Sequence, residues 1–333
     1  MPSSLANLVS KCTVFRDQKT HVTTLKLSVF DIPMLSCQYM QKGVLLKSPP
    51  FCFDDLVGLL KQSLSTTLSH FPPLAGRLMT DPDGHVHIDC NDAGIDFLVV
   101  KSPTLSINDI LCPGDVPDCV KELFTFDRTL SYTGHFKALA AVQVTELVDG
   151  VFIGCSVNHA VTDGTSFWHF FNTFAEITKG ASKISKAPDF CRETGITEIS
   201  SFQSLCAQIW RSVTRARNLE PTKTTTFRME VNCRHRLDPK LNSYYSGNAI
   251  QSIPNFAPAG ELLANDMSWG ANLLHKNVGR QYISALLLLE SPKLQGKNHR
   301  TLEGLSANEC LTGTLTKSKG QGRLEELNHE LKE

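Results

Sequence analysis

An apolar run that ends in a polar turn and continues as an amphipathic helix limits the possible folds most strongly. Residues 151–159, VFIGCSVNH, have the composition of a fully buried strand, and His159 stands at its end. Thr165 or Ser166 is placed to cap the following helix, which should end before Gly180. That helix carries a wide apolar face made of Phe167, Trp168, Phe170, Phe171, Phe174 and Ile177. A strand packed under a helix predicts an α/β fold.

The first half of the chain shows the same alternation of strand and helix. Residues 22–30, VTTLKLSVF, predict a strand, which Asp31, Ile32 and Pro33 then end. Residues 53–71 place leucines at helical spacing behind two aspartates that suit the positive end of a helix dipole. The proline pair at 72–73 should stop this helix.

Turn signals and a second helix extend the pattern. DPDG at 81–84 and Asp149-Gly150 predict two hairpins between short strands. Residues 200–217, SSFQSLCAQIWRSVTRAR, predict a helix capped by Ser200 or Ser201. Residues 224–232 alternate like a half-buried strand.

Size and charge narrow the possible partners. At 333 residues and 41% hydrophobic, the chain can bury one large core or two ordinary ones. Lys plus Arg equals Asp plus Glu at 33 each, so no global field attracts nucleic acid or a membrane surface. An anionic ligand must therefore meet local positive groups.

The cysteines and the apolar segments suggest a reduced, cytoplasmic protein. The eleven cysteines are scattered, with no CxxC and no metal-finger spacing, so we expect neither a metal site nor a disulfide framework. The start of the chain lacks the apolar run of a signal peptide, and the apolar cluster at 285–289 is too short to cross a bilayer.

The candidate chemistry lies in residues 158–164, NHAVTDG. Four-residue spacing across a tight turn, which Gly164 would permit, lets Asp163 point into the scaffold while the imidazole of His159 faces a cavity. A lone histidine is otherwise best read as a core residue satisfied by a backbone carbonyl. The spacing alone is weak evidence, because His85 and Asp89 in HVHID form the same HxxxD string. No glycine or helix follows that copy, which we interpret as structural.

Five landmarks occur together in a characteristic order along the chain. They are LSVFDIPML at 27–35, FPPLAGRL at 71–78, HAVTDG at 159–164, the helix at 200–217, and VNCRHRLDP with YYSGNAI between 231 and 250. In this arrangement the chain resembles the plant BAHD, or HXXXD-type, acyl-CoA-dependent acyltransferases over residues 1 to 278.

The resemblance implies a two-lobed fold like that of chloramphenicol acetyltransferase, with mixed sheets flanked by helices and a channel between the lobes. It implies acyl-CoA as co-substrate, a small-molecule alcohol or amine as acceptor, no permanently bound cofactor, and a monomer. His159 would act as the general base for direct transfer without an acyl-enzyme. No GxSxG nucleophile elbow occurs, in keeping with that mechanism.

Other site residues follow from the same resemblance. Asp163 would be structural and paired with Arg234 or Arg236. For the arginine that does not form this pair, a solvated position at a strand end is an equal alternative to a role in the site. Gly247 and Asn248 match a Gly-Asn pair near the family's channel, or they serve a turn.

The chain departs from the family pattern in two places. The DFGWG string is missing, and Ser268-Trp269-Gly270, in a helix-like context, does not replace it. The segment expected between Phe190 and the helix at 200–217 is also short, which suggests alternative splicing or a faulty gene model. We therefore expect an N-terminal lobe at 1–190, an incomplete second lobe at 195–290, and a divergent, poorly ordered tail at 291–333 whose end favours a helix.

Three interpretations stay open at this stage. The chain is an active acyltransferase, a catalytically silent shortened isoform of low stability, or a lyase on the same scaffold that works without CoA. The sequence indicates acyltransferase ancestry, and it favours present activity over a silent form.

Overall fold

The protein forms two compact units. The computed structural model describes residues 6–18, 23–114, 116–180, 201–237, 240–242 and 245–289. The first unit is built from residues 1–188 together with 243–249, and the second from residues 189–242 with 250–333. Residues 245–249 were predicted to belong to the second lobe, whereas the structure places them in the first unit. Their hydrogen bonds to that unit, described below, explain the difference.

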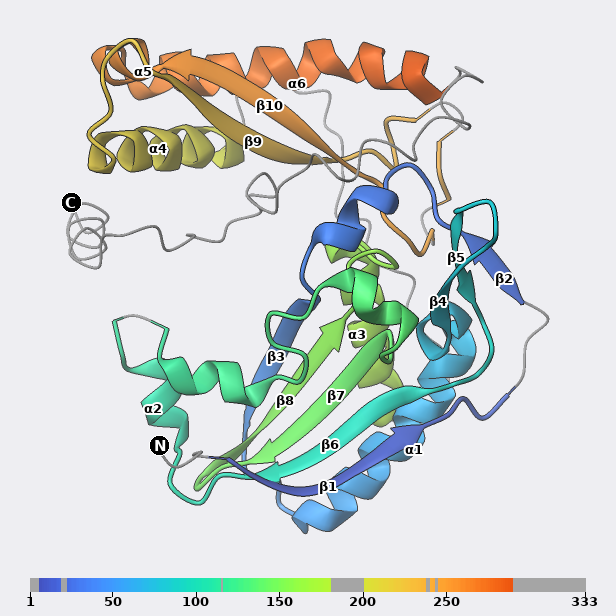
Figure 1. The fold of residues 1–333 in the computed structure, drawn as a ribbon. Helices are drawn as coiled ribbons and strands as arrows, with labels where there is room; N and C mark the ends of the chain where they lie inside the picture. Colours follow the sequence, from blue (N-terminus) through green and yellow to red (C-terminus); the bar gives the residue numbers. More distant parts are fainter. Residues whose placement is uncertain are drawn as a thin grey trace. The chain divides into compact units, whose positions relative to one another are not determined.

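A five-stranded mixed sheet organises the first unit (Figure 1). Its order is β1-β6-β7-β8-β3, with β6 and β7 parallel and the other pairs antiparallel. The strands are β1 (Asn7–Val14), β3 (Met40–Lys47), β6 (Ile95–Lys101), β7 (Ala140–Glu146) and β8 (Gly150–Val157). Helices α1 (Phe53–His70) and α3 (Gly164–Thr178) pack on one face and enclose the main apolar core. This arrangement confirms the α/β prediction.

Helix α1 forms where the leucine spacing predicts it. Its apolar face is buried, its first turn carries the two expected aspartates, and the short 3-10 helix η2 (Pro72–Ala75) follows it directly. Leu64 and Leu68 are fully buried against the sheet. Burial of such side chains stabilises the packing by about 1.5–3 kcal/mol each.

A small three-stranded sheet has the order β2-β5-β4, from β2 (Thr24–Lys26), β4 (Arg77–Thr80) and β5 (Val86–Asp89). The hairpin predicted at DPDG is confirmed, since Gly84 has a φ of 86° and its N–H donates to the Asp81 carbonyl at 2.9 Å. The strand predicted over 22–30 is too long. It ends after Lys26 because the segment from Ser28 to Asp31 folds into a hydrogen-bonded turn instead.

The second unit pairs β9 (Thr224–Asn232) with β10 (Ile250–Pro258) in an antiparallel ribbon. Helix α4 (Ser201–Ala216) and helix α6 (Met267–Leu289) share a core with this ribbon, and α5 (Ala259–Ala264) links β10 to α6. The helix predicted at 200–217 and the strand predicted at 224–232 are confirmed, while the cap at Ser200 or Ser201 lies outside the described side chains. Ser268, Trp269 and Gly270 are helical in α6, as their context predicted.

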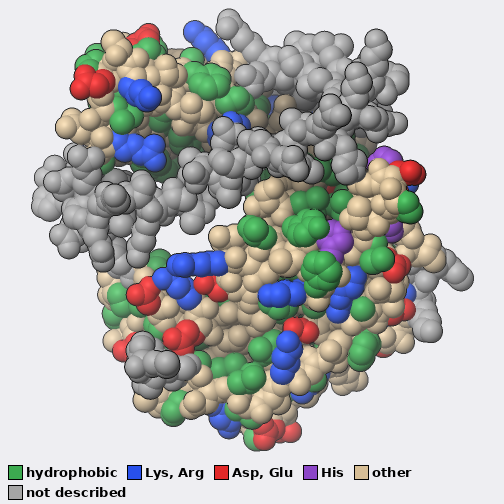
Figure 2. Space-filling view, in the orientation of Figure 1, with side chains coloured by type: hydrophobic (Ala, Val, Ile, Leu, Met, Phe, Trp, Pro, Cys, Tyr) green, Lys and Arg blue, Asp and Glu red, His purple; other side chains and the backbone are tan. Residues whose placement is uncertain are grey.

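Several properties of the described residues bear on function. None of their helices is both long and apolar enough to span a bilayer. On the face drawn in Figure 2, basic and acidic side chains are interspersed rather than gathered into a field of one sign. The described cysteines are free thiols, buried at positions such as Cys37 and Cys155 but exposed at Cys52 and Cys112. Residues 291–333, predicted to be poorly ordered, lie outside the described part of the chain.

Candidate functional site

The turn between β8 and α3 carries the histidine that the sequence singled out. Strand β8 lies between β7 and β3, and every one of its residues is buried. Val157, its last residue, pairs with Ala140 on one side and Met40 on the other. His159 therefore stands just beyond the end of a strand that is held on both edges, as the buried run predicted.

Two neighbouring side chains fix the backbone around His159. The N–H of His159 donates to the Ser131 hydroxyl at 3.0 Å. Asn158 is fully buried, donates from its amide to the Ser131 carbonyl at 2.7 Å, and accepts from the N–H of Ala160 at 2.9 Å. Ser131 begins the 3-10 helix η4 (Ser131–His135), so two elements of the same unit hold the turn.

The imidazole of His159 is not tied to this network. Among the described residues its Nδ1 atom is buried and has no hydrogen-bond partner. A histidine with a structural role usually donates a ring N–H to a carbonyl or carboxylate oxygen. The described residues therefore do not support the alternative of a core histidine whose ring is hydrogen-bonded to a backbone carbonyl. A half-buried imidazole without such a bond can accept or donate a proton.

Asp163 uses both of its carboxylate oxygens on backbone groups. It is fully buried, with Oδ1 accepting from the N–H of Ser166 at 2.9 Å and Oδ2 from the N–H of Ala249 at 3.0 Å. The first contact makes Asp163 itself the N-cap of α3, so the predicted cap at Thr165 or Ser166 is wrong. The carboxylate thus joins the start of α3 to residue 249.

Gly164 is not required by the geometry of the turn. It is the first residue of α3 and is not among the described glycines with positive φ. A Cβ built there would meet nothing within 4 Å. The expectation that Gly164 permits the turn is wrong, because the turn closes through Asp163 and Asn158 instead.

The segment 245–249 is docked beside the His159 turn. The Ser166 hydroxyl donates to the Gly247 carbonyl at 2.9 Å and accepts from the Gly247 N–H at 3.1 Å. The Asn248 amide donates to the carbonyl of His159 at 2.8 Å. Gly247 has a φ of 149°, and a Cβ there would lie within 3.0 Å of the Tyr245 ring. Gly247 and Asn248 therefore belong to the same constellation as His159 and Asp163.

Asp31, a further member of this constellation, was not predicted from the sequence as a site residue. Asp31 is 5% exposed, and its Oδ1 accepts from both the N–H and the side-chain amide of Asn248, at 3.1 and 2.8 Å. In the sequence it was interpreted as a residue that ends a strand and as part of the landmark at 27–35, with no role in the site. The local signal was Ser28 three residues earlier, whose hydroxyl and N–H both donate to Oδ2.

The predicted partners of Asp163 lie in the other compact unit. Arg234 and Arg236 form a turn after β9, where the N–H of Arg234 donates to the Asn232 side chain at 3.0 Å. A pairing of either arginine with Asp163 stays a prediction.

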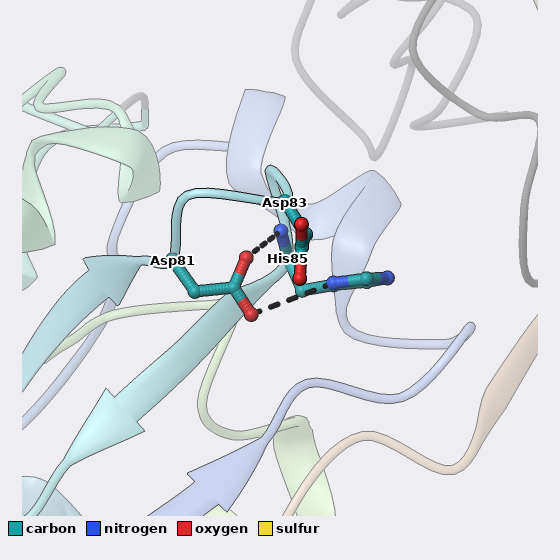
Figure 3. Close-up of side chains that lie close together, drawn as sticks. All are labelled: Asp81, Asp83 and His85. Carbon is teal, nitrogen blue, oxygen red and sulfur yellow. Dashed lines mark hydrogen bonds and ion pairs between the residues drawn. The ribbon is translucent and has the colours of Figure 1, made fainter.

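The second HxxxD string forms no comparable site. His85 directly precedes β5, and its Nδ1 atom lies 3.4 Å from a carboxylate oxygen of Asp81 (Figure 3). Asp81, Asp83 and His85 cluster at the turn. The turn is closed by a hydrogen bond, since the backbone N–H of His85 donates to the Asp81 carboxylate at 2.8 Å. Exposed turn carboxylates of this kind are common without an ion.

Comparisons with known proteins show to which family the chain belongs. The family model described as "Transferase family" matches residues 6–198 and 193–309, which extends past residue 278, where the sequence analysis expected the resemblance to end. The BAHD acyltransferase DCR of Arabidopsis thaliana is 31% identical over 350 residues, covering 80% of this chain and 72% of its own. Two further relatives are each 27% identical. Shikimate O-hydroxycinnamoyltransferase of Nicotiana tabacum covers 70% of this chain and 66% of its own length. Hydroxycinnamoyl-CoA:5-hydroxyanthranilate N-hydroxycinnamoyltransferase HHT4 of Avena sativa covers 61% of this chain and 59% of its own length.

Solved structures show the same fold. Vinorine synthase superposes with a TM-score of 0.69 at 18% identity, covering 86% of this chain and 80% of its own. F. sporotrichioides TRI101, complexed with coenzyme A and T-2, gives 0.66 at 15% identity, with 81% and 78% covered. The fold and the family match together define a transferase. The chain belongs to the BAHD acyltransferase family.

The alignments also locate a difference from the relatives. The alignment with the Arabidopsis relative runs over 350 positions, more than the 333 residues of the whole chain, yet it covers only 80% of it. Part of the relative therefore has no counterpart inside the aligned region. The family model matches in two pieces that meet at 193–198, next to the predicted short segment after Phe190.

Proposed function

We propose that this chain transfers an acyl group from acyl-CoA to the hydroxyl or amine of a small molecule, with His159 as the general base. The imidazole takes the proton of the acceptor while the acceptor oxygen or nitrogen attacks the thioester carbonyl carbon. The tetrahedral intermediate collapses, the carbon–sulfur bond breaks, and the CoA thiolate receives the proton. No covalent acyl-enzyme forms, so no nucleophilic serine or cysteine is needed.

One observation carries this proposal. The backbone of His159 is hydrogen-bonded on both sides, its buried Nδ1 has no hydrogen-bond partner among the described residues, and the carboxylate of Asp163 accepts from backbone N–H groups. A base needs a fixed position and a nitrogen free to exchange a proton. Asp163 accepts from two backbone N–H groups, so the proposal assigns it a scaffold role beside the His159 turn.

The named relatives support the choice of substrates. One is named for oxygen acylation of shikimate, and another for nitrogen acylation of hydroxyanthranilate by hydroxycinnamoyl-CoA. The TRI101 structure of the same fold holds coenzyme A together with T-2. Acyl-CoA as co-substrate and a small alcohol or amine as acceptor fit this set.

A second candidate is a catalytically silent form of the same enzyme. It is favoured by the aligned region of the Arabidopsis relative that has no counterpart here, and by the two-piece family match that meets at 193–198. A chain that keeps the His159 turn but lacks part of the surrounding body could retain the histidine and lose turnover.

Thioester turnover separates the two. The purified 333-residue chain is incubated with acetyl, malonyl, aliphatic and hydroxycinnamoyl CoA donors and with pooled alcohols and amines, and free CoA is measured with a thiol reagent. The proposal predicts CoA release that needs both donor and acceptor and that His159→Ala abolishes. Absence of release from folded protein with every pair would favour the silent form, while turnover of an acceptor pool without CoA thioester would indicate a lyase.

A further inference from the structure

Asp31 is a buried carboxylate with a full set of hydrogen-bond donors. It follows the turn that begins at Ser28, and its Oδ2 accepts from the Ser28 N–H at 2.7 Å and the Ser28 hydroxyl at 2.6 Å. Its Oδ1 accepts from the N–H and the side-chain amide of Asn248. The four donors are two backbone N–H groups, a hydroxyl and an amide. The carboxylate is therefore fixed in orientation from both sides.

Asn248 passes this constraint on to His159. Its side-chain nitrogen donates to Asp31 and to the carbonyl oxygen of His159, each at 2.8 Å. Both partners can only accept, so the amide nitrogen must face them and the orientation of Asn248 is settled by chemistry. Asn248 is fully buried, which leaves it little room to turn.

The two peptide groups of His159 are thus held by different side chains. The Ser131 hydroxyl holds its N–H, and Asn248 holds its carbonyl. Hydrogen bonds on both sides of one Cα fix the backbone there and so fix the direction of the Cα–Cβ bond. The direction of that bond determines where the imidazole can reach.

We infer that Asp31 is a positioning residue for His159 and acts through Asn248. The inference rests on the proposed function, since it assigns Asp31 a part in aiming the base. Asp31 makes no hydrogen bond to the imidazole. Its effect should be seen in turnover rather than in substrate binding, because displacement of a reacting group by about 1 Å can slow a reaction on the order of 100-fold.

The first test is kinetic. Asp31→Asn keeps the size of the side chain but replaces one acceptor oxygen with an NH₂ group, which then faces hydrogen-bond donors. We expect kcat to fall by about 10- to 100-fold with KM changed by less than about threefold. Asp55→Asn, an exposed position in the first turn of α1, is the matched control and should leave both constants unchanged.

A double-mutant cycle tests the route through Asn248. Asp31→Ala and Asn248→Ala should each lower kcat, and the double variant should be no slower than the slower single variant. Independent, multiplying effects would overturn the route. Should Asp31→Asn fail to fold, Asn248→Ala alone decides, because an unchanged kcat in that folded variant contradicts the inference.

A readout without turnover separates this inference from the proposed function. The imidazole signals of His159 are followed by NMR of histidine-labelled protein and assigned by their loss in His159→Ala. They should move in Asp31→Asn and Asn248→Ala but not in Asp55→Asn. If the wild-type chain releases no CoA and the signals still move, the positioning role stands and the proposed function fails. If the signals and kcat are unchanged in folded Asp31→Asn, the positioning role is overturned.

Discussion

The chain contains the string HxxxD twice, and the two copies have different surroundings. At the first copy, His85 precedes an antiparallel strand, its side chain is 61% exposed, and Asp81 lies beside it. At the second, His159 follows a fully buried strand and Asp163 begins a helix. In neither copy is the aspartate of the string the partner of the histidine. The backbone that carries the string decides its role.

The difference lies in what the aspartate does for the chain around it. Asp163 is fully buried and caps α3 while also holding residue 249. Asp89 is partly exposed at the end of β5, a position that needs no capping. Only the second copy therefore builds a rigid support under its histidine.

The largest expected effect on stability comes from comparing the two aspartates. Asp163→Ala removes a helix cap and leaves two backbone N–H groups without their acceptor, so the free energy of unfolding should fall by about 2–4 kcal/mol. Asp89→Ala should lower it by less than about 1 kcal/mol. Urea denaturation followed by circular dichroism measures both. Equal midpoints for the two variants would show that the aspartates play similar roles.

A pair of glycines gives the next largest effect. Gly247 has a φ of 149°, and an added Cβ would contact Tyr245, so Gly247→Ala should destabilise by about 1–3 kcal/mol. Gly164→Ala meets open space at the start of a helix and should be neutral or stabilising by up to about 1 kcal/mol. Thermal unfolding of both variants decides. A large loss at Gly164 would restore that glycine to the turn.

The hydroxyl of Ser166 should contribute less. Ser166→Ala removes the bonds that Oγ makes with the N–H and carbonyl of Gly247, and should lower the free energy of unfolding by about 1–2 kcal/mol. Thr178→Val is the matched control, because its hydroxyl only donates back to the Phe174 carbonyl within the same helix. Its effect should stay within about 0.5 kcal/mol. Equal losses in the free energy of unfolding for the two variants would mean that Ser166 does not stabilise segment 245–249.

The smallest effect concerns acid titration at the first copy. The N–H of His85 donates to Asp81 and lowers the pKa of that carboxyl below its ordinary value of 3.8. A carboxyl whose folded pKa is depressed stabilises the fold above its unfolded pKa and loses this contribution as pH falls through the folded value. Asp81→Asn should therefore destabilise the hairpin near neutral pH but not near pH 2. The same difference at both pH values would contradict the assignment.

The local sequence pattern predicted many of the helices and strands, but it could not predict which residues far apart in the sequence make contact. The helices at 53–70 and 201–216 follow leucine or aromatic periodicity, and the strand–turn–helix around His159 follows an apolar run with a polar break. Strands β1, β3, β6 and β10 were not predicted. Most residues of β1 are exposed and β3 has no fully buried residue, so neither gives the signal of a buried run.

The contact between Asp31 and the predicted residue Asn248 was missed for a different reason. Asp31 and Asn248 are 217 positions apart in the sequence, and no local spacing indicates that they meet. The cap of α3 was predicted at the wrong residue. Asp163 was expected to have a scaffold role, but it was not recognised as the residue that caps the helix. A single side chain does both, since its two oxygens accept from residues 166 and 249.

The proposed function assigns the role of base to His159 and not to His85, the other histidine of the same string. Release of CoA by His159→Ala and His85→Ala, measured side by side with the wild-type chain on one donor and acceptor pair, tests it most directly. We expect a loss of about 10²- to 10⁴-fold in kcat for His159→Ala and wild-type turnover for His85→Ala. Unchanged turnover in folded His159→Ala, or equal losses in both variants, would contradict it.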